Sequence, residues 1–217
     1  MGSLSHPFGI DLALSVAMWP AELRLIFVLR FRRGNKLCVA AVRSHSPSRM
    51  SRQSCIPNDL VRRANRVLKR LADRKLTAIT AESCTAGLVA ASLSLADGAS
   101  NTLHGSFVTY TKANKVSALG VPPALLKREG AVTRGVATAM LKGALRYSPA
   151  DIAVAVTGVL GPEPDDDGNP VGLVYLGCQR RGRRAKVVRK IYGKKPSDTL
   201  RRWAVRDALR LLDESLR

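Results

Sequence analysis

Short apolar runs alternate with amphipathic segments along residues 58–217 of this chain. Runs rich in β-branched residues, or alternating in polarity, are typical of strands, whereas apolar residues spaced three and four apart indicate helices. The expected strands cover residues 76–81, 104–110 and 152–156, with a hairpin formed by residues 171–179 and 185–192. The expected helices cover residues 58–75, 85–96, 111–119, 133–147 and 197–216.

This alternation of helices and strands indicates an α/β fold. The run Ile152–Val156 is apolar at every position, which is typical of a central strand that helices cover on both faces. Because the last two strands form a hairpin, the sheet cannot be entirely parallel. We therefore expect a three-layer α/β/α domain with a mixed, mostly parallel sheet and a C-terminal hairpin followed by a helix.

Residues 1–57 do not continue this pattern. Their apolar stretch, Ile10–Phe31, is interrupted by charged residues and a proline, so it is a poor candidate for a membrane span, which needs about 20 largely uncharged residues. The Arg- and Ser-rich residues that follow resemble a transit peptide in composition. The globular pattern begins just after Met50, however, which favours a true start there. We expect a basic, disordered or misassigned extension at residues 1–57 and a globular domain at residues 58–217.

The charge of the chain suggests what it binds. The net charge is +20, and residues 58–217 carry 28 basic and 14 acidic side chains, so the excess belongs largely to the domain itself. A basic body suggests an anionic partner, either a phosphorylated small molecule or a nucleic acid. A surface charged for solubility accounts for the excess equally well.

The metal-binding side chains are few and scattered. The four cysteines form neither a short paired pattern nor a zinc-binding one; they are Cys38, Cys55, Cys84 and Cys178. This usage favours a reduced, cytoplasmic protein. The acidic run Asp165–Asp167 could bind a divalent cation, but a solvated turn is the simpler interpretation. We predict no metal and no cofactor.

The stretch Leu76–Gly87 is the first candidate for chemistry. A strand that breaks sharply into a helix lifts the turn residues above the sheet edge and points free N–H groups at them. Ser83 lies at this turn, where a helix cap is the simpler role. A serine hydroxyl becomes a nucleophile when a base removes its proton, and a lysine with a lowered pKa can serve as that base. Lys115 follows the expected strand end at Tyr110, although a single lysine is more often solvated.

The ends of three expected strands meet at one edge if those strands are parallel, and ligands bind at such edges in open α/β sheets. These ends carry Ser83, Tyr110 and Thr157. Gly158 and Gly161, which follow, would let the backbone approach a phosphate. Ser100 lies in another turn, where a cap or turn role is again the simpler one. The convergence is stronger evidence than any single residue.

Four motifs follow one another in order along the domain: TAESCTAGLVAASL, FVTYTKANKVSALGVPPALL, GAVTRGVATAM and DIAVAVTGVLGP…NPVGLVYLG. Together they resemble the C-terminal domain of the competence/damage-inducible protein CinA, over about residues 58–216. Stand-alone versions of that domain are nicotinamide-nucleotide amidases. The resemblance implies hydrolysis of the carboxamide of nicotinamide mononucleotide to nicotinate mononucleotide and ammonia, through serine and lysine and without a metal.

The resemblance also implies roles for individual residues. It places the candidate serines at Ser83 and Ser100, with Ser83 favoured as the nucleophile, and it makes Lys115 the base, tuned by Tyr110. The other serine, Thr157 and backbone N–H groups are expected to hold the developing oxyanion. The residues expected to bind substrate are Glu82, Cys84, Thr85, Gly87, Gly158, Gly161 and Arg201, the last through the substrate phosphate.

Several positions depart from the family pattern. Ala86 replaces the first glycine of a Gly-Gly pair, and Thr111-Lys112 replaces Ser-Asn. The acidic segment EPDDDGN, residues 163–169, replaces a glycine-rich loop, and Asn169 stands in place of its lysine. Because the catalytic positions are retained and the loop facing the substrate is not, the reaction class is better supported than the substrate.

Two functions from different classes follow. The first is an amidase of pyridine nucleotide recycling, which the retained set of hydroxyls and Lys115 favours. The second is a catalytically weak or inactive protein, linked to competence or DNA damage, that binds a nucleotide or a nucleic acid through its basic surface. We expect a small-molecule nucleotide as substrate, nucleic acid as a less favoured partner, no membrane partner, and a homo-oligomer.

Overall fold

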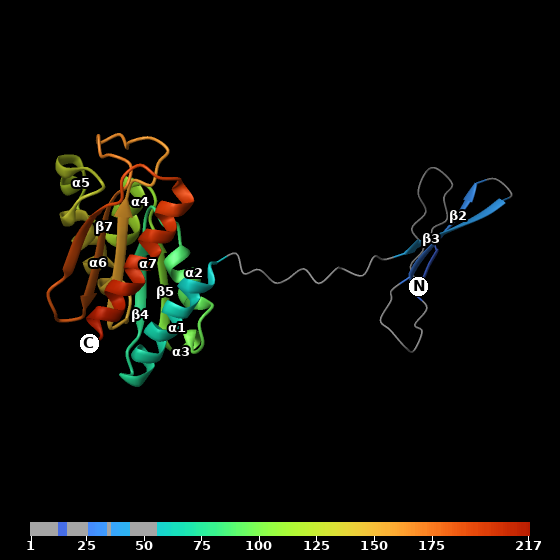
Figure 1. Ribbon diagram of the computed structural model, residues 1–217, viewed down its shortest axis with the longest axis horizontal. Helices are drawn as coiled ribbons and strands as arrows, with labels where there is room; N and C mark the ends of the chain where they lie inside the picture. The colour runs from blue at the N-terminus through green and yellow to red at the C-terminus, as the bar shows by residue number, and fades with distance from the viewer. Residues whose placement is uncertain (1–12, 17–25, 34–35, 44–55) are drawn as a thin grey trace. The chain divides into compact units, whose positions relative to one another are not determined.

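The computed structural model describes residues 13–16, 26–33 and 36–43 by their backbone and residues 56–217 in full (Figure 1). The chain divides into two units, residues 1–53 and residues 54–217. The first unit holds three antiparallel strands in the order β1 (Ala13–Val16), β2 (Ile26–Arg33) and β3 (Lys36–Arg43). Apart from residues 56 and 57, the rest of the expected extension, including the proposed start at Met50, lies outside the described residues. Its disorder or misassignment therefore stays a prediction.

The second unit is built on a five-stranded sheet. Its strands lie in the order β5 (Leu103–Val108), β4 (Ala78–Glu82), β6 (Ile152–Gly158), β7 (Leu173–Arg180) and β8 (Lys186–Ile191). β4 is parallel to both of its neighbours, whereas β7 is antiparallel to β6 and to β8. Four strands therefore share one direction and only β7 opposes them, which confirms the mixed, mostly parallel sheet.

Helices cover both faces of this sheet, so the three-layer α/β/α arrangement is confirmed (Figure 1). One face is covered by α1 (Asn58–Asp73), α2 (Leu88–Ser94), α3 (Ala99–Thr102) and α7 (Ser197–Ser215). The other face is covered by α4 (Lys112–Leu119), α5 (Pro123–Glu129) and α6 (Arg134–Arg146).

The two layers of the core consist largely of Ala, Val and Leu side chains. Every residue of β4 is buried, and β6 is buried from Ile152 to Thr157, as expected for strands that helices cover on both faces. Close packing is most pronounced at Gly143 of α6, where a Cβ atom would lie 2.0 Å from the carbonyl oxygen of Leu119. Only glycine allows α4 and α6 to approach each other in this way.

Strand and helix boundaries agree with the sequence prediction to within a few residues, and the largest difference lies before α2. The expected helix over 85–96 begins only at Leu88, because Ala86 and Gly87 adopt left-handed φ angles of 51° and 93°. The chain thus makes a tight turn between β4 and α2. This turn lies at the carboxyl end of β4, on the same edge of the sheet as the ends of β5 and β6.

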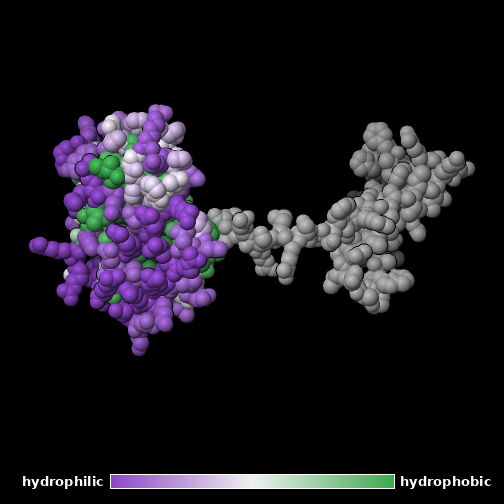
Figure 2. All heavy atoms as spheres, viewed as in Figure 1, coloured by the Kyte–Doolittle hydropathy of each residue, from purple (hydrophilic) through white to green (hydrophobic). Residues whose placement is uncertain are grey.

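The exterior of the second unit is mainly hydrophilic on the face in Figure 2, with small, separate hydrophobic areas. None of the helices in the described ranges combines the length and the apolar character that a membrane crossing requires.

Candidate active site

The site begins where β4 ends. The backbone N–H of Ser83 donates to the carbonyl oxygen of Val156 at 3.0 Å, which continues the parallel pairing with β6 one residue past the strand. The chain then turns away from the sheet, so Ser83 stands above its edge. Ser83 is nonetheless buried, since only 7% of the residue is exposed.

Lys115 lies directly against this serine. It is the fourth residue of α4, and its Nζ donates hydrogen bonds to Ser83 Oγ at 2.8 Å and to the carbonyl oxygens of Thr109 at 2.8 Å and Tyr110 at 3.3 Å. The residue is 1% exposed, and no described carboxylate forms an ion pair with it. The structure therefore brings the predicted base and the favoured nucleophile into contact.

Burial changes the protonation of Lys115. Removal from water disfavours the charged ammonium and lowers the pKa of Lys115 to about 8. A substantial fraction of this amine is therefore neutral near pH 8. Burial also raises the pKa of the Cys84 thiol to about 12, so this cysteine stays protonated and is a poor nucleophile.

Tyr110 contributes to the site mainly through its backbone. The residue is 67% exposed, and its only hydrogen bond with Lys115 is through its carbonyl oxygen. The expected tuning of Lys115 by the Tyr110 side chain stays a prediction. The preceding residue, Thr109, was missed by the sequence reasoning. It is fully buried, its N–H donates to the Glu82 carbonyl oxygen at 2.7 Å, and its own carbonyl oxygen accepts from Lys115.

The carboxylate of Glu82 is bonded inside the fold, and its expected contact with substrate stays a prediction. It is fully buried, and its carboxylate accepts hydrogen bonds from the N–H groups of Gly87, Val89 and Ala90 at 2.9–3.1 Å. It also accepts from the hydroxyl groups of Thr80 and Thr85. A carboxylate satisfies the unpaired N–H groups at the start of a helix. Glu82, Thr85 and Gly87 therefore hold the turn that presents Ser83.

Thr157 lies near the end of β6 and is 1% exposed. Its hydroxyl group donates to the carbonyl oxygen of Ala131 at 2.9 Å. That proton is therefore already used, which argues against the expected role of the hydroxyl as an oxyanion donor. The backbone N–H groups of Cys84 and Thr85, in contrast, donate to no other residue within residues 56–217.

Ser100 is not brought to this site. It lies in α3, which leads into the amino end of β5, and Leu103 at that end pairs with Ala78 at the start of β4. The site lies at the opposite, carboxyl ends of these strands, roughly 16 Å further along a six-residue strand. Of the two candidate serines, only Ser83 contacts Lys115, because parallel strands place their two ends on opposite edges of the sheet.

A pocket of about 220 Å³ opens at this edge. Eight of the predicted site residues line it: Ser83, Cys84, Tyr110, Lys115, Thr157, Gly158, Gly161 and Arg201. Ser100 and the three residues that hold the turn do not. Arg201 comes from α7, and its buried Nε has no hydrogen-bond partner. A buried, unpaired guanidinium nitrogen is costly unless a ligand satisfies it, so an anion is the ligand that this wall of the pocket fits.

Further residues line the pocket that the sequence reasoning did not assign. Ala131 and Val132 reach it from the connection before α6, and Glu163 and Asp165 reach it from the loop after β6. The acidic loop was noted from its departure from the family pattern. Nothing in its sequence, however, indicated that it would fold back over the ends of β4 and β5.

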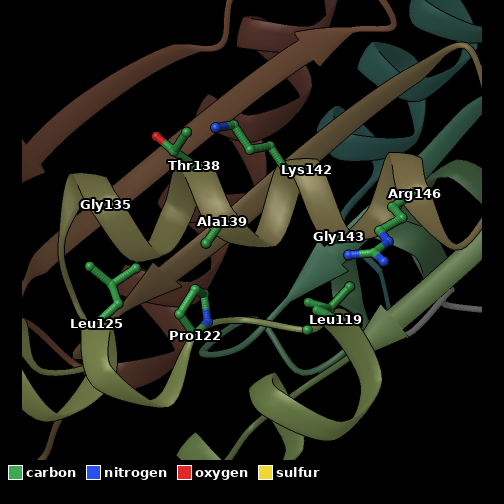
Figure 3. A pocket seen from close by; sticks show the side chains of 10 residues that line it. Leu119, Pro122, Leu125, Gly135, Thr138, Ala139, Lys142, Gly143 and Arg146 are labelled. Atoms are coloured by element: carbon green, nitrogen blue, oxygen red, sulfur yellow. The ribbon is translucent and has the colours of Figure 1, made fainter.

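A larger hollow of about 370 Å³ lies elsewhere, between α6 and the α4–α5 connection (Figure 3). Its floor is formed by apolar and small residues such as Leu119, Pro122 and Ala139, and its cations are Lys142 and Arg146. It holds neither a carboxylate nor a nucleophile paired with a base. The smaller pocket is therefore the candidate active site.

Within residues 56–217, no group of three or more His, Cys, Asp or Glu side chains is arranged to hold a metal ion. Cys84 and Cys178 are both buried and unpaired thiols. The run Asp165–Asp167 does not converge on one point, because Asp165 accepts from backbone N–H groups of its own loop and Asp167 faces Lys112.

Comparison with known proteins agrees with the family resemblance of the four sequence motifs. The model of the CinA C-terminal domain family matches residues 61–216. A CinA-like protein of Synechococcus sp. (strain RCC307) is 39% identical over 164 residues, which is 76% of this chain and 39% of the relative. A putative competence-damage inducible protein of Symbiobacterium thermophilum is 50% identical over 113 residues, or 52% of this chain and 26% of the relative. The chain thus corresponds to less than half the length of these curated relatives.

Solved structures show the same fold. The competence/damage inducible protein CihA from Agrobacterium tumefaciens superimposes with a TM-score of 0.71 at 39% identity, covering 75% of this chain and 98% of that one. A CinA superfamily protein from Klebsiella pneumoniae 700603 superimposes with a TM-score of 0.69 at 31% identity, covering 72% and 97%. The three-layer domain is therefore shared with these proteins.

Proposed function

Because the chain belongs to the CinA C-terminal domain family, we propose that it hydrolyses the carboxamide of nicotinamide mononucleotide to nicotinate mononucleotide and ammonia. The observation that carries this proposal is the 2.8 Å contact between Lys115 Nζ and Ser83 Oγ. It supplies a nucleophile and a base where the described residues offer neither a histidine nor a metal at the site.

The first half of the reaction forms an acyl-enzyme. In its neutral form Lys115 Nζ accepts the proton of Ser83 Oγ, and the oxygen attacks the carboxamide carbon. The resulting oxyanion is stabilised by the unpaired N–H groups of Cys84 and Thr85. The ammonium form of Lys115 then returns its proton to the leaving nitrogen, so that ammonia departs and Ser83 carries the acyl group as an ester.

The second half regenerates the enzyme. Lys115, again neutral, removes a proton from a water molecule, and the hydroxide attacks the ester carbon. The bond to Ser83 Oγ breaks, and that oxygen recovers the proton from Lys115. The products are a free serine and a carboxylic acid, which ionises to the carboxylate by releasing its proton to the solvent. The sum of both halves is the consumption of one water per amide.

Arg201 supports a substrate that carries a phosphate. Its Nε is buried and unpaired on the pocket wall, and a guanidinium group binds phosphate oxygens through charge-assisted hydrogen bonds. Lys115 cannot replace it, because its Nζ is already engaged by Ser83 Oγ and the carbonyl oxygens of Thr109 and Tyr110. A nucleotide is therefore a better match than a nucleoside.

The test is a product assay with the purified full-length chain. Nicotinamide mononucleotide, the corresponding nucleoside and free nicotinamide are incubated separately, and ammonia and the carboxylate product are quantified. We expect release of both from the nucleotide and little from the other two. No turnover of any amide by a folded preparation would refute the proposal.

A binding protein without catalysis is the second candidate, and the net charge of +20 is the observation that favours it. It predicts association with DNA or RNA that weakens as salt rises. It does not account for the contact between Lys115 and Ser83, because a nucleic-acid surface needs no buried, partly neutral amine. The expected homo-oligomer stays a prediction.

A further inference from the structure

Two positions that depart from the family pattern meet in the structure. Lys112 stands at the start of α4, and Asp167 lies 55 residues later in the acidic loop 163–169. Lys112 Nζ donates a hydrogen bond to Asp167 Oδ1, and the two form an ion pair. The loop that follows β6 is thereby tied to the helix that carries Lys115.

The Asp167 carboxylate has a hydrogen-bond donor on each oxygen, and the backbone leaves room for it. Its Oδ2 accepts the backbone N–H of Ala131 at 2.9 Å. Gly130, with a φ of 75°, leaves the space for it, because a Cβ atom there would lie 2.7 Å from Asp167 Cγ. Both oxygens of the carboxylate are therefore used.

The residues that bind the Asp167 carboxylate are connected to residues of the pocket. Ala131, which donates to Asp167, accepts the hydroxyl proton of Thr157 through its carbonyl oxygen. Lys112 lies three residues before Lys115, about one turn of the same helix. The contact of Asp167 with Lys112 and Ala131, here called the loop latch, thus joins the loop to two walls of the pocket.

Hydrogen bonds within the loop connect Asp165, Asp167 and Asn169. Asp165 accepts hydrogen bonds from the N–H groups of Asp167 and Asn169 and from the Asn169 amide. Glu163 also lines the pocket, but its carboxylate has no hydrogen bond or ion pair with any residue of the described ranges. It faces the same pocket as Arg201, so the pocket has one cationic and one anionic wall.

We propose that the loop latch positions loop 163–169 so that the Glu163 carboxylate faces the bound substrate, and that Glu163 thereby selects a nucleotide whose ring carries a positive charge. This inference rests on the proposed function and adds a residue that selects its substrate. A pyridinium nucleotide has a positive ring and an anionic phosphate, which complement Glu163 and Arg201. A carboxamide nucleotide with a neutral ring lacks the attraction to Glu163.

The charge state of Asp167 supports the latch, and the adjacent residue provides a control. The hydrogen bond from Lys112 is the main cause that lowers the pKa of Asp167, with the Ala131 N–H acting in the same direction, so the carboxylate is charged at neutral pH. Asp166, the adjacent carboxylate, is exposed and has no contact of this kind with any described residue. It is therefore a matched control.

The experiment measures binding separately from turnover. In full-length chain carrying Ser83→Ala, the Kd values of nicotinamide mononucleotide and of its 1,4-dihydro form, whose ring is neutral and whose phosphate is unchanged, are determined by calorimetry. We expect the form with the positively charged ring to bind better, and we expect Glu163→Gln to reduce that preference about fivefold. Asp167→Asn and Lys112→Met are expected to reduce it similarly, Lys112→Arg to restore it, and Asp166→Asn to leave it unchanged.

Hydrogen exchange of the loop provides a readout that needs no ligand. Asp167→Asn and Lys112→Met should accelerate exchange of the amides of residues 165–169, with no greater effect when combined, because both remove one contact. Unchanged exchange in these variants would overturn the latch. An unchanged ratio of Kd values in Glu163→Gln, or no binding of either nucleotide, would overturn the role of Glu163. The product assay on the unaltered chain reports independently on the amidase proposal.

Discussion

Lys115 Nζ lies 2.8 Å from Ser83 Oγ, although the two residues are 32 positions apart and belong to different layers of the structure. The amine approaches from α4, on one face of the sheet, and the hydroxyl from the turn between β4 and α2. The remaining contacts of the amine are carbonyl oxygens, and no described carboxylate pairs with it. This geometry allows a lysine to act as a base near neutral pH.

The first prediction concerns pH. Because the pKa of Lys115 is lowered to about 8 and only the neutral amine accepts a proton, kcat/KM should rise with pH and level off above an apparent pKa near 8. Below that value it should fall about tenfold per pH unit. Lys115→Arg should lower activity by about 100-fold or more at every pH, since arginine stays protonated. A profile with no transition between pH 7 and 9 would exclude Lys115 as the base.

The second prediction separates the two serines. Ser83→Ala should lower kcat by about 1,000-fold or more, because no other described hydroxyl group contacts Lys115. Ser100→Ala should leave kcat within about twofold of the unaltered chain, since Ser100 lies on the opposite edge of the sheet and is exposed. Both variants are compared by ammonia release and by thermal unfolding. Loss of activity in Ser100→Ala with an unchanged Tm would contradict this assignment.

The third prediction concerns Arg201. Arg201→Met should raise KM for the nucleotide by about 10- to 100-fold and change KM for the corresponding nucleoside little, because the guanidinium group is proposed to bind the phosphate. Arg202→Met is the matched control: Arg202 pairs with Asp59 of α1 at 2.7 Å and does not line the pocket. Steady-state kinetics of both variants with the nucleotide and with the nucleoside tests this prediction. An equal loss for nucleotide and nucleoside would argue against phosphate recognition.

The fourth prediction concerns the turn before α2. Ala86 has a φ of 51°, a left-handed conformation that costs a residue with a Cβ atom about 1 kcal/mol relative to glycine. Ala86→Gly should therefore raise the free energy of unfolding by about 1 kcal/mol and Tm by about 2–4 °C.

The same exchange inside the helix provides the control. Ala90→Gly within α2 should lower stability by about 1 kcal/mol, because glycine in a helix interior loses more backbone entropy. Thermal unfolding of the two variants under identical conditions tests whether Tm rises in Ala86→Gly and falls in Ala90→Gly. Destabilisation by both would show that the Ala86 methyl group contributes packing that outweighs its backbone strain.

Part of the site was predictable from the sequence. The sequence predicts Ser83, Tyr110 and Thr157 at one edge on the condition that their strands are parallel, and the structure shows that these three strands are parallel and that their ends lie together. Glu82 was assigned to substrate because it belongs to the same motif. Its actual partners are N–H groups up to eight residues later, and the left-handed turn that brings them back is not visible in a linear sequence of small residues.

The sequence by itself determined the layered α/β architecture, the order of its elements and the family, because hydrophobic periodicity and motif spacing are local properties that burial fixes. The tertiary structure decided which serine meets Lys115, that Glu82 supports the turn, and that Asp167 reaches Lys112. These outcomes depend on which sheet edge each strand end occupies and on how loops fold across it. Contacts between residues far apart in the chain arise from packing, and no local pattern encodes them.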